Sequence, residues 1–229
     1  GKAKHNAFVQ VSTIKITDSG LWGVSSNIGI FHISLKKKGD IYPKEQPSWK
    51  KNWNRFTFVS ILDTEDVIYF GTNEGRVIQY NRSAKSFDVL EPFNNFGKRV
   101  LSFSLGGNKN IWFVSEDGLY EYNLSSSIIS RRLTTREVAQ SAFYSLECDA
   151  NGVFWIGGNN ALVQYDPLNQ STQILTEADG AISNEYNSAT LFSKQKLYMG
   201  TVDGILQVDT KMSVLRGEKP FIEIENVEI

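Results

Sequence analysis

Five copies of one sequence pattern recur along this chain of 229 residues, and they limit its fold more than any other feature. In each copy, an aromatic residue stands in a short apolar segment that is followed by a polar turn. The aromatic residues, called anchor aromatics below, are Trp22, Tyr69, Trp112, Trp155 and Tyr198. Their spacings are 47, 43, 43 and 43 residues. A fixed period of about 20 to 50 residues is typical of repeat architectures, so five equivalent units are expected.

Each unit reads as antiparallel strands joined by tight turns. In the third unit, the apolar segments 111–114 and 119–123 flank a polar turn that ends at Gly118. Glycine supplies the positive φ that a hairpin turn needs, while β-branched and aromatic residues suit the flanking strands. An apolar strand precedes each pair, starting at residues 11, 55, 99, 141 and 188, and a more polar strand follows from residues 86, 127, 171 and 212.

Four antiparallel strands in about 43 residues make one blade of a β-propeller, in which the innermost strand is the most buried. Because no segment shows sustained 3.6-residue periodicity, helix content should be close to zero. We therefore predict an all-β fold, a β-propeller of four-stranded antiparallel blades with five repeats in residues 1–219. Each anchor aromatic should be buried in the second strand of its blade, against the neighbouring blade.

The number of repeats leaves two arrangements open. Five blades can close into a small ring, or they can form an arc excised from the C-terminal part of a larger propeller, which we favour. An arc would expose an apolar blade face at each end, and such a face favours association with another copy.

The overall charge and composition disfavour several partners. With 24 basic and 25 acidic residues, the net charge of -1 offers no concentrated basic surface for nucleic acid or an anionic membrane. No apolar run reaches the roughly 18 residues of a membrane-spanning helix, so no direct membrane insertion is expected. A single cysteine, Cys148, and two histidines do not make a cysteine-built or histidine-rich metal site, and no cofactor is expected.

The aligned units resemble two-component regulator propeller repeats, in which an Asp-Gly or Asn-Gly turn precedes Leu-Trp-Ile-Gly-Thr and an aromatic-Asp-Pro element follows. Residues 149–157 and the tripeptide Tyr165-Asp166-Pro167 match this pattern. Residues 179–187 are similar to the family's Gly-Leu-x-Ser-Asn-Glu-Phe element. Residues 220–229 resemble the first strand of the immunoglobulin-like domain that usually follows, and we predict an extra strand there. Residues 36–55 and 106–110 depart from the family pattern.

The resemblance implies a function in signalling. Such propellers form the extracytoplasmic sensor of membrane-bound bacterial hybrid histidine kinases, so the resemblance implies a periplasmic module that perceives an extracellular saccharide. The alternative is a protein-interaction or dimerisation module without a small-molecule site, whose partners are a second copy or adjacent receptor domains. Catalysis is not expected, because most acids lie in turns whose conformational preferences explain them, and Glu147 and Glu185 alone are placed to face the axis.

The loops that enter the innermost strands are long and varied, whereas the turns of the opposite face are short and repetitive. Recognition residues are more frequent on varied loops, so we expect an oligosaccharide to bind on the entering-loop face. The two tryptophans of the loop before residue 56 suit stacking on a sugar, although packing over the edge of the first blade also explains them. The candidate ligand-binding residues are Trp49, Trp53, Arg55, Asn94, Asn95, Arg99, Arg136, Asn184, Glu185 and Tyr186.

Overall fold

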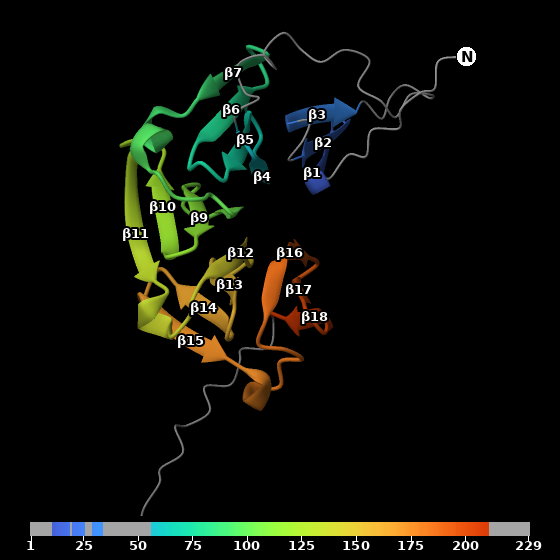
Figure 1. Ribbon diagram of the computed structural model, residues 1–229, viewed down its shortest axis with the longest axis vertical. Helices are drawn as coiled ribbons and strands as arrows, with labels where there is room; N and C mark the ends of the chain where they lie inside the picture. The colour runs from blue at the N-terminus through green and yellow to red at the C-terminus, as the bar shows by residue number, and fades with distance from the viewer. Residues whose placement is uncertain (1–10, 19, 26–28, 34–55, 211–229) are drawn as a thin grey trace, which may run out of the picture.

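The computed structural model describes residues 11–18, 20–25, 29–33 and 56–210 (Figure 1). These residues form five antiparallel sheets in which each strand pairs with the next along the chain. The first sheet contains β1 (Val11–Thr17), β2 (Gly20–Ser25) and β3 (Gly29–Ile33). The second contains β4 (Phe58–Asp63), β5 (Val67–Thr72), β6 (Val77–Asn81) and β7 (Ser86–Val89). The third contains β8 (Ser102–Leu105), β9 (Ile111–Ser115), β10 (Gly118–Asn123) and β11 (Ile128–Thr134). The fourth contains β12 (Phe143–Cys148), β13 (Phe154–Gly158), β14 (Leu162–Asp166) and β15 (Ser171–Leu175), and the fifth contains β16 (Tyr186–Ser193), β17 (Lys196–Thr201) and β18 (Gly204–Asp209).

The sheets are the five blades of a propeller arranged around a common axis (Figure 1), which confirms the predicted fold. The innermost strands β1, β4, β8, β12 and β16 pack side by side in this order. The helices of the described residues are three short 3-10 segments, at 91–95, 136–138 and 177–179. The predicted outer strand of the fifth blade and the predicted extra strand at 220–229 lie outside the described residues.

The anchor aromatics hold each blade against the next one. Trp22 of blade 1 lies over Tyr80 of blade 2, with ring centroids 4.9 Å apart, and Trp112 of blade 3 lies 4.4 Å from Phe154 of blade 4. Trp155 packs in the same way into an apolar cluster of blade 5 that includes Met199. Side chains alternate between the two faces of a strand. Each blade therefore has an anchor face, which carries its own anchor aromatic, and a receiving face, which contacts the anchor aromatic of the preceding blade.

Four of the five anchor aromatics are buried, as predicted, and Tyr198 is half-exposed. Tyr198 belongs to the last blade, whose anchor face has no following blade among the described residues. The expectation of burial therefore fails at this position, because no blade of the described residues packs over the Tyr198 ring as blade 5 packs over Trp155.

A bulge recurs near the start of the innermost strand in four of the five blades. In blade 4 it brings Ser145 opposite Gly157. A Cβ at Gly157 would lie 2.4 Å from the Ser145 oxygen and 2.7 Å from the Tyr186 Cβ, so glycine permits the close approach of blades 4 and 5. Blade 2 repeats this geometry, because Ser60 lies opposite Gly71 and a Cβ at Gly71 would lie 2.3 Å from the Ser60 oxygen.

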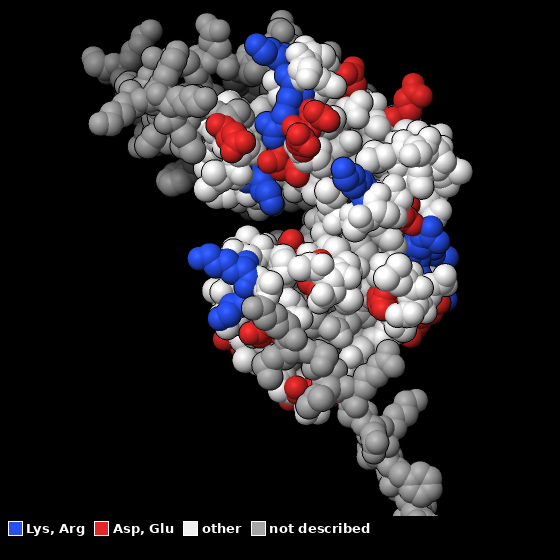
Figure 2. Space-filling model, turned by 180° about the vertical axis from the view of Figure 1, so that it is seen from behind, with Lys and Arg blue, Asp and Glu red and all other residues white. Residues whose placement is uncertain are grey.

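The two ends of the series carry apolar side chains on their outward faces. On blade 1, Ile14 and Ile16 pair with Gly23 and Leu21, on the face that would receive an anchor, and Ile16 is 69% exposed. On blade 5, Leu191 pairs with Tyr198 on the anchor face, and Ile205 of this blade is 72% exposed. Figure 2 shows a notch in the outline of the molecule between these two blades.

Candidate functional site

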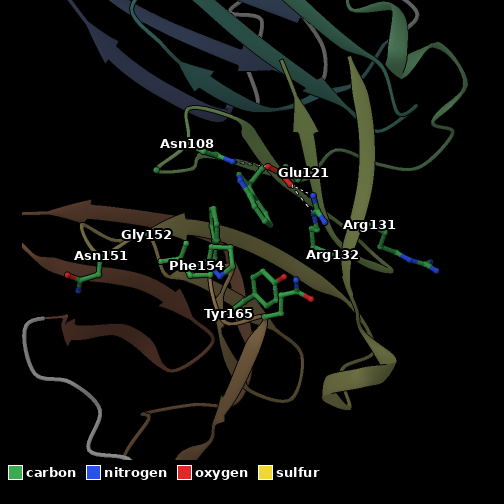
Figure 3. A pocket seen from close by; sticks show the side chains of 13 residues that line it. Asn108, Glu121, Arg131, Arg132, Asn151, Gly152, Phe154 and Tyr165 are labelled. Atoms are coloured by element: carbon green, nitrogen blue, oxygen red, sulfur yellow. Dashed lines mark hydrogen bonds and ion pairs between the residues drawn. The ribbon is translucent and has the colours of Figure 1, made fainter. Parts of the chain in front are cut away.

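A pocket of about 570 Å³ opens between blades 3 and 4 (Figure 3) and is called the interblade pocket below. Its wall combines residues of β9, β10 and β11 with residues of β13 and β14 and of three turns. This volume falls within the range of about 300–1,000 Å³ that is common for small-molecule sites. The lining residues are Gly107, Asn108, Trp112, Glu121, Arg131, Arg132, Asn151, Gly152, Phe154, Tyr165, Pro167, Leu168 and Gln170.

Aromatic rings form the apolar part of the pocket. Trp112 reaches across from blade 3, with its ring centroid 4.4 Å from that of Phe154 and 6.1 Å from that of Tyr165. All three side chains are buried and belong to the cluster that joins the two blades. The same packing that positions the anchor aromatic therefore fixes one side of the pocket.

The polar part of the pocket is centred on Glu121, a residue of β10 that is only 6% exposed. Its carboxylate accepts hydrogen bonds from the Asn110 amide at 2.6 Å and the Asn108 amide at 3.0 Å. Arg132 of β11 donates to the same carboxylate from Nε at 2.9 Å and from a terminal nitrogen at 2.6 Å. Burial favours a higher pKa for Glu121, but these hydrogen bonds and the Arg132 charge outweigh it and lower the pKa.

The charges around the pocket are largely balanced. Glu121 and Arg132 neutralise each other within the pocket. Arg131 points away from Arg132 (Figure 3) and lies 3.5 Å from Asp117. The pocket thus offers fixed N–H and oxygen groups beside apolar rings without a strong net charge, which suits a neutral polar ligand.

The rim of the pocket is made by turns. At the β12–β13 turn, Asp149 accepts hydrogen bonds from the backbone N–H groups of Asn151 and Val153 and from the Trp155 indole, the latter at 3.0 Å. The Asp149 carboxylate thus stabilises the Asp-x-x-Gly turn and also binds the anchor Trp155, which explains why the turn and the anchor are a fixed number of residues apart. At the β14–β15 turn, Leu168 is 87% exposed and lines the pocket.

The candidate residues that were predicted from the sequence and lie within the described ranges do not line the interblade pocket, and they do not form one cluster. Asn94 and Asn95 are exposed in a 3-10 helix after β7, where the Asn94 side chain accepts a hydrogen bond from Arg76 at 3.0 Å. Arg99 is exposed and pairs with Glu116 at 2.9 Å. Trp49, Trp53 and Arg55 lie outside the described residues.

The remaining candidates come from the loops that enter blades 4 and 5. Arg136 is exposed in the 3-10 helix before β12, and Glu185 is exposed before β16. The Asn184 side chain accepts a hydrogen bond from the backbone N–H of Glu177 at 3.0 Å. Tyr186 is buried in the cluster between blades 4 and 5, where burial raises its pKa to about 12, so its position corresponds to packing.

The interblade pocket lies at the end of the blades opposite the entering loops, since the β8–β9, β12–β13 and β14–β15 regions contribute its rim and floor. Sequence reasoning missed it because Trp112 and Tyr165 read as core residues, which they also are. One sequence feature could have indicated the pocket. Glu121 lies opposite the anchor Trp112 in the third strand of its blade, at a position where the second repeat has an uncharged residue, Gln79.

In the part of the chain that the structure describes, no three acidic, histidine or cysteine side chains gather to hold a metal ion. Cys148 is half-buried, and burial raises the pKa of its thiol to about 12. None of the helices found in the described residues is long and apolar enough to cross a membrane.

Comparison with known proteins agrees with the resemblance seen in the repeats. The chain is 24% identical over 277 aligned positions to a protein of Formosa agariphila named "Histidine kinase P4", covering 96% of this chain and 20% of that protein. No protein-family model matches the sequence. The chain thus spans about a fifth of the length of this curated relative.

Solved structures show the same fold at low sequence identity. The extracellular domain of a putative hybrid two-component system of B. thetaiotaomicron superposes with a TM-score of 0.69 at 16% identity, over 87% of this chain and 27% of that chain. A second domain of this kind gives 0.65 at 20% identity, over 91% and 28% of the two chains. An inactive variant of virginiamycin B lyase from Staphylococcus aureus gives 0.63 at 13% identity, over 92% and 73%. The chain therefore has the propeller fold of the extracellular domains of hybrid two-component systems and is similar in sequence to a histidine kinase.

Proposed function

We propose that this propeller is the ligand-sensing module of the extracytoplasmic part of a two-component histidine kinase, and that it binds a neutral oligosaccharide in the interblade pocket. The observation that carries the proposal is the joining of fixed polar groups and aromatic rings in one pocket of about 570 Å³. The similarity to a histidine kinase and to extracellular sensor domains supports the signalling role. Because a lyase shares the fold, the fold alone does not separate sensing from catalysis.

A saccharide suits the chemistry of this pocket. Sugars present apolar C–H faces and many hydroxyl groups, so they need rings or aliphatic surface beside donors and acceptors in fixed positions. Leu168 offers apolar surface at the rim, while Arg132 is held in place by its two hydrogen bonds to Glu121. Both oxygens of Glu121 are engaged with protein donors, which gives this acid a structural role rather than that of a free general acid.

Isothermal titration calorimetry of the chain with a panel of plant and host oligosaccharides tests the proposal. Asn151→Ala and Leu168→Ala alter the rim of the pocket without disturbing a strand, and each should weaken binding by at least about fivefold, or roughly 1 kcal/mol. Leu124→Ala is the matched control, because Leu124 is an exposed leucine at the corresponding turn of blade 3 and does not line the pocket.

The entering-loop face is tested in the same experiment with Arg99→Ala and Arg136→Ala. If these variants lose affinity and the pocket variants keep it, the ligand binds on the entering-loop face and the interblade pocket is rejected. If no oligosaccharide binds to the wild-type chain at millimolar concentration, saccharide sensing by this propeller is rejected.

A further inference from the structure

A second cavity, called the axial cavity below, lies where the innermost strands of all five blades meet. It has a volume of about 310 Å³ and is lined by residues of β1, β4, β8, β12 and β16 and by Leu101 just before β8. Lys15 and Ser188 are exposed, so the cavity is reached from solvent. This volume is at the small end of the range for ligand sites, about 300–1,000 Å³, and fits a small molecule.

Hydroxyl groups around this cavity are used to join the blades. Thr13 of β1 donates a hydrogen bond to the Val59 carbonyl of β4 at 3.0 Å. Ser60 of β4 donates to the Val100 carbonyl beside β8 at 2.8 Å, and Ser102 of β8 accepts from the backbone N–H of Leu146 in β12 at 3.2 Å. These three hydroxyls therefore contribute to the cohesion of the inner ring.

Two opposite charges occupy equivalent positions of this ring. Lys15 pairs with Trp22 in blade 1, and Glu147 pairs with Trp155 in blade 4, so each charged residue stands opposite the anchor of its blade. The other three repeats place Leu62, Ser104 and Leu191 at this position. The third charged lining residue, Asp63, is already paired with Arg82.

Lys15 and Glu147 line the same cavity, yet they do not form an ion pair with each other. Within the described residues, the Glu147 carboxylate accepts one side-chain hydrogen bond, from the Thr190 hydroxyl at 3.5 Å. Burial raises the pKa of Glu147 to about 7, while the Lys15 charge and the Thr190 hydroxyl act to lower it. A carboxylate in such a site gains free energy from a partner that brings a positive charge and N–H donors.

We propose that the axial cavity binds a small zwitterion of the amino-acid type, with its ammonium group on Glu147 and its carboxylate directed to Lys15. A molecule with both charges bridges the separation that keeps the two side chains from pairing directly. The ligand class differs from that of the interblade pocket, so this site is independent of saccharide binding.

Calorimetric titration with glycine, β-alanine, γ-aminobutyrate and 5-aminovalerate tests the proposal, because this series varies the distance between ammonium and carboxylate. We expect one length to bind best, and acetate, methylammonium and glycerol to bind at least tenfold more weakly than this best length. Glu147→Gln and Lys15→Met should each weaken binding of the best zwitterion by at least tenfold. The double exchange Lys15→Glu with Glu147→Lys should restore binding, since a zwitterion fits in the reverse direction.

Glu65→Gln and Lys85→Met are the charge-matched controls, because both residues are exposed and lie outside the cavity. Thermal unfolding followed by circular dichroism checks that each variant is folded. Because Lys15 is exposed, Lys15→Met should fold even if Glu147→Gln does not, so the proposal stays testable. Lack of binding by the whole series at 10 mM, or equal binding by both cavity variants and wild type, would overturn the proposal. Binding of Ca²⁺ that Lys15→Met strengthens, without binding of any zwitterion, would also overturn it by identifying a cation site. Oligosaccharide affinity should be the same in Glu147→Gln as in the wild type.

Discussion

Glu147 links the stability of the fold to pH. Its pKa is about 7 in the folded chain and close to the ordinary value of 4.5 in the unfolded chain, so the folded state holds a proton more tightly. The stabilisation by the protonated carboxyl is complete below about pH 4.5 and is lost as the pH rises through 7. At one pKa unit per about 1.4 kcal/mol, this loss amounts to at most about 3 kcal/mol, and solvent near the half-buried group reduces it.

Glu147→Gln should remove this dependence, because glutamine is neutral at every pH. We expect the variant to gain stability over the wild type between pH 5 and pH 8, as measured by urea denaturation at several pH values. Carboxylates with a lowered pKa, such as Asp117 and Glu121, are present in both proteins and cancel in the difference. A constant difference in unfolding free energy across this range would show that Glu147 ionises normally in the folded chain.

At the residue level, the sequence predicted what depends on neighbours within one repeat. The turn at Asp149 to Gly152 and the distance to Trp155 are local, so pattern recognition was sufficient to find them. From the sequence, Glu147 was also expected to face the axis, and it lines the axial cavity. The proximity of Lys15 to Glu147 was not predictable in the same way, since it arises only when blades 1 and 4 are brought around the axis. The placement of Tyr186 in the core also depends on contact between two blades.

At the level of the strands, the anchor aromatics of inner blades and of the last blade should differ in their contribution to stability. Trp155 is 2% exposed between blades 4 and 5, so Trp155→Ala should cost about 3–5 kcal/mol. Tyr198 occupies the same position in blade 5 but is half-exposed, so Tyr198→Ala should cost less than about 1.5 kcal/mol. Chemical denaturation of both variants measures the difference, and equal costs would contradict the assignment of an uncovered anchor face to blade 5.

The repeat period predicted the strands well, because alternation and turn residues are properties of short segments. The innermost strands, the anchor strands and three of the four predicted outer strands appear near their expected positions. The interblade pocket was not predicted, because its wall joins side chains such as Glu121 and Tyr165 that are more than 40 residues apart in the sequence. Its polar network is satisfied within one blade, but its apolar side exists only where two blades meet.

At the scale of the whole molecule, the apolar end faces should make the chain associate with itself. Ile16 on blade 1 and Ile205 on blade 5 are exposed to water, which favours burial against another copy. Sedimentation velocity should show a monomer that becomes a larger species as concentration rises. Ile16→Lys combined with Ile205→Lys should raise the dissociation constant at least about tenfold, or about 1.4 kcal/mol.

Leu168→Lys is the control for self-association, because Leu168 is exposed but lies on a turn away from the end faces. It should leave the dissociation constant unchanged. A chain that remains monomeric at all accessible concentrations would show that the end faces do not drive association.

The alternation of anchor and receiving faces gives the blade series a direction, and this direction has a consequence for recombination. Every internal junction has the same polarity, with an aromatic side chain of one unit entering the apolar face of the next. Exchange of a complete unit, cut at matching positions between an outer and an inner strand, preserves this polarity at both new junctions. Gene segments of one period in length are therefore the natural unit of chimeras. A cut within a blade would instead separate the strand that carries the anchor aromatic from strands of the same blade that form its receiving face.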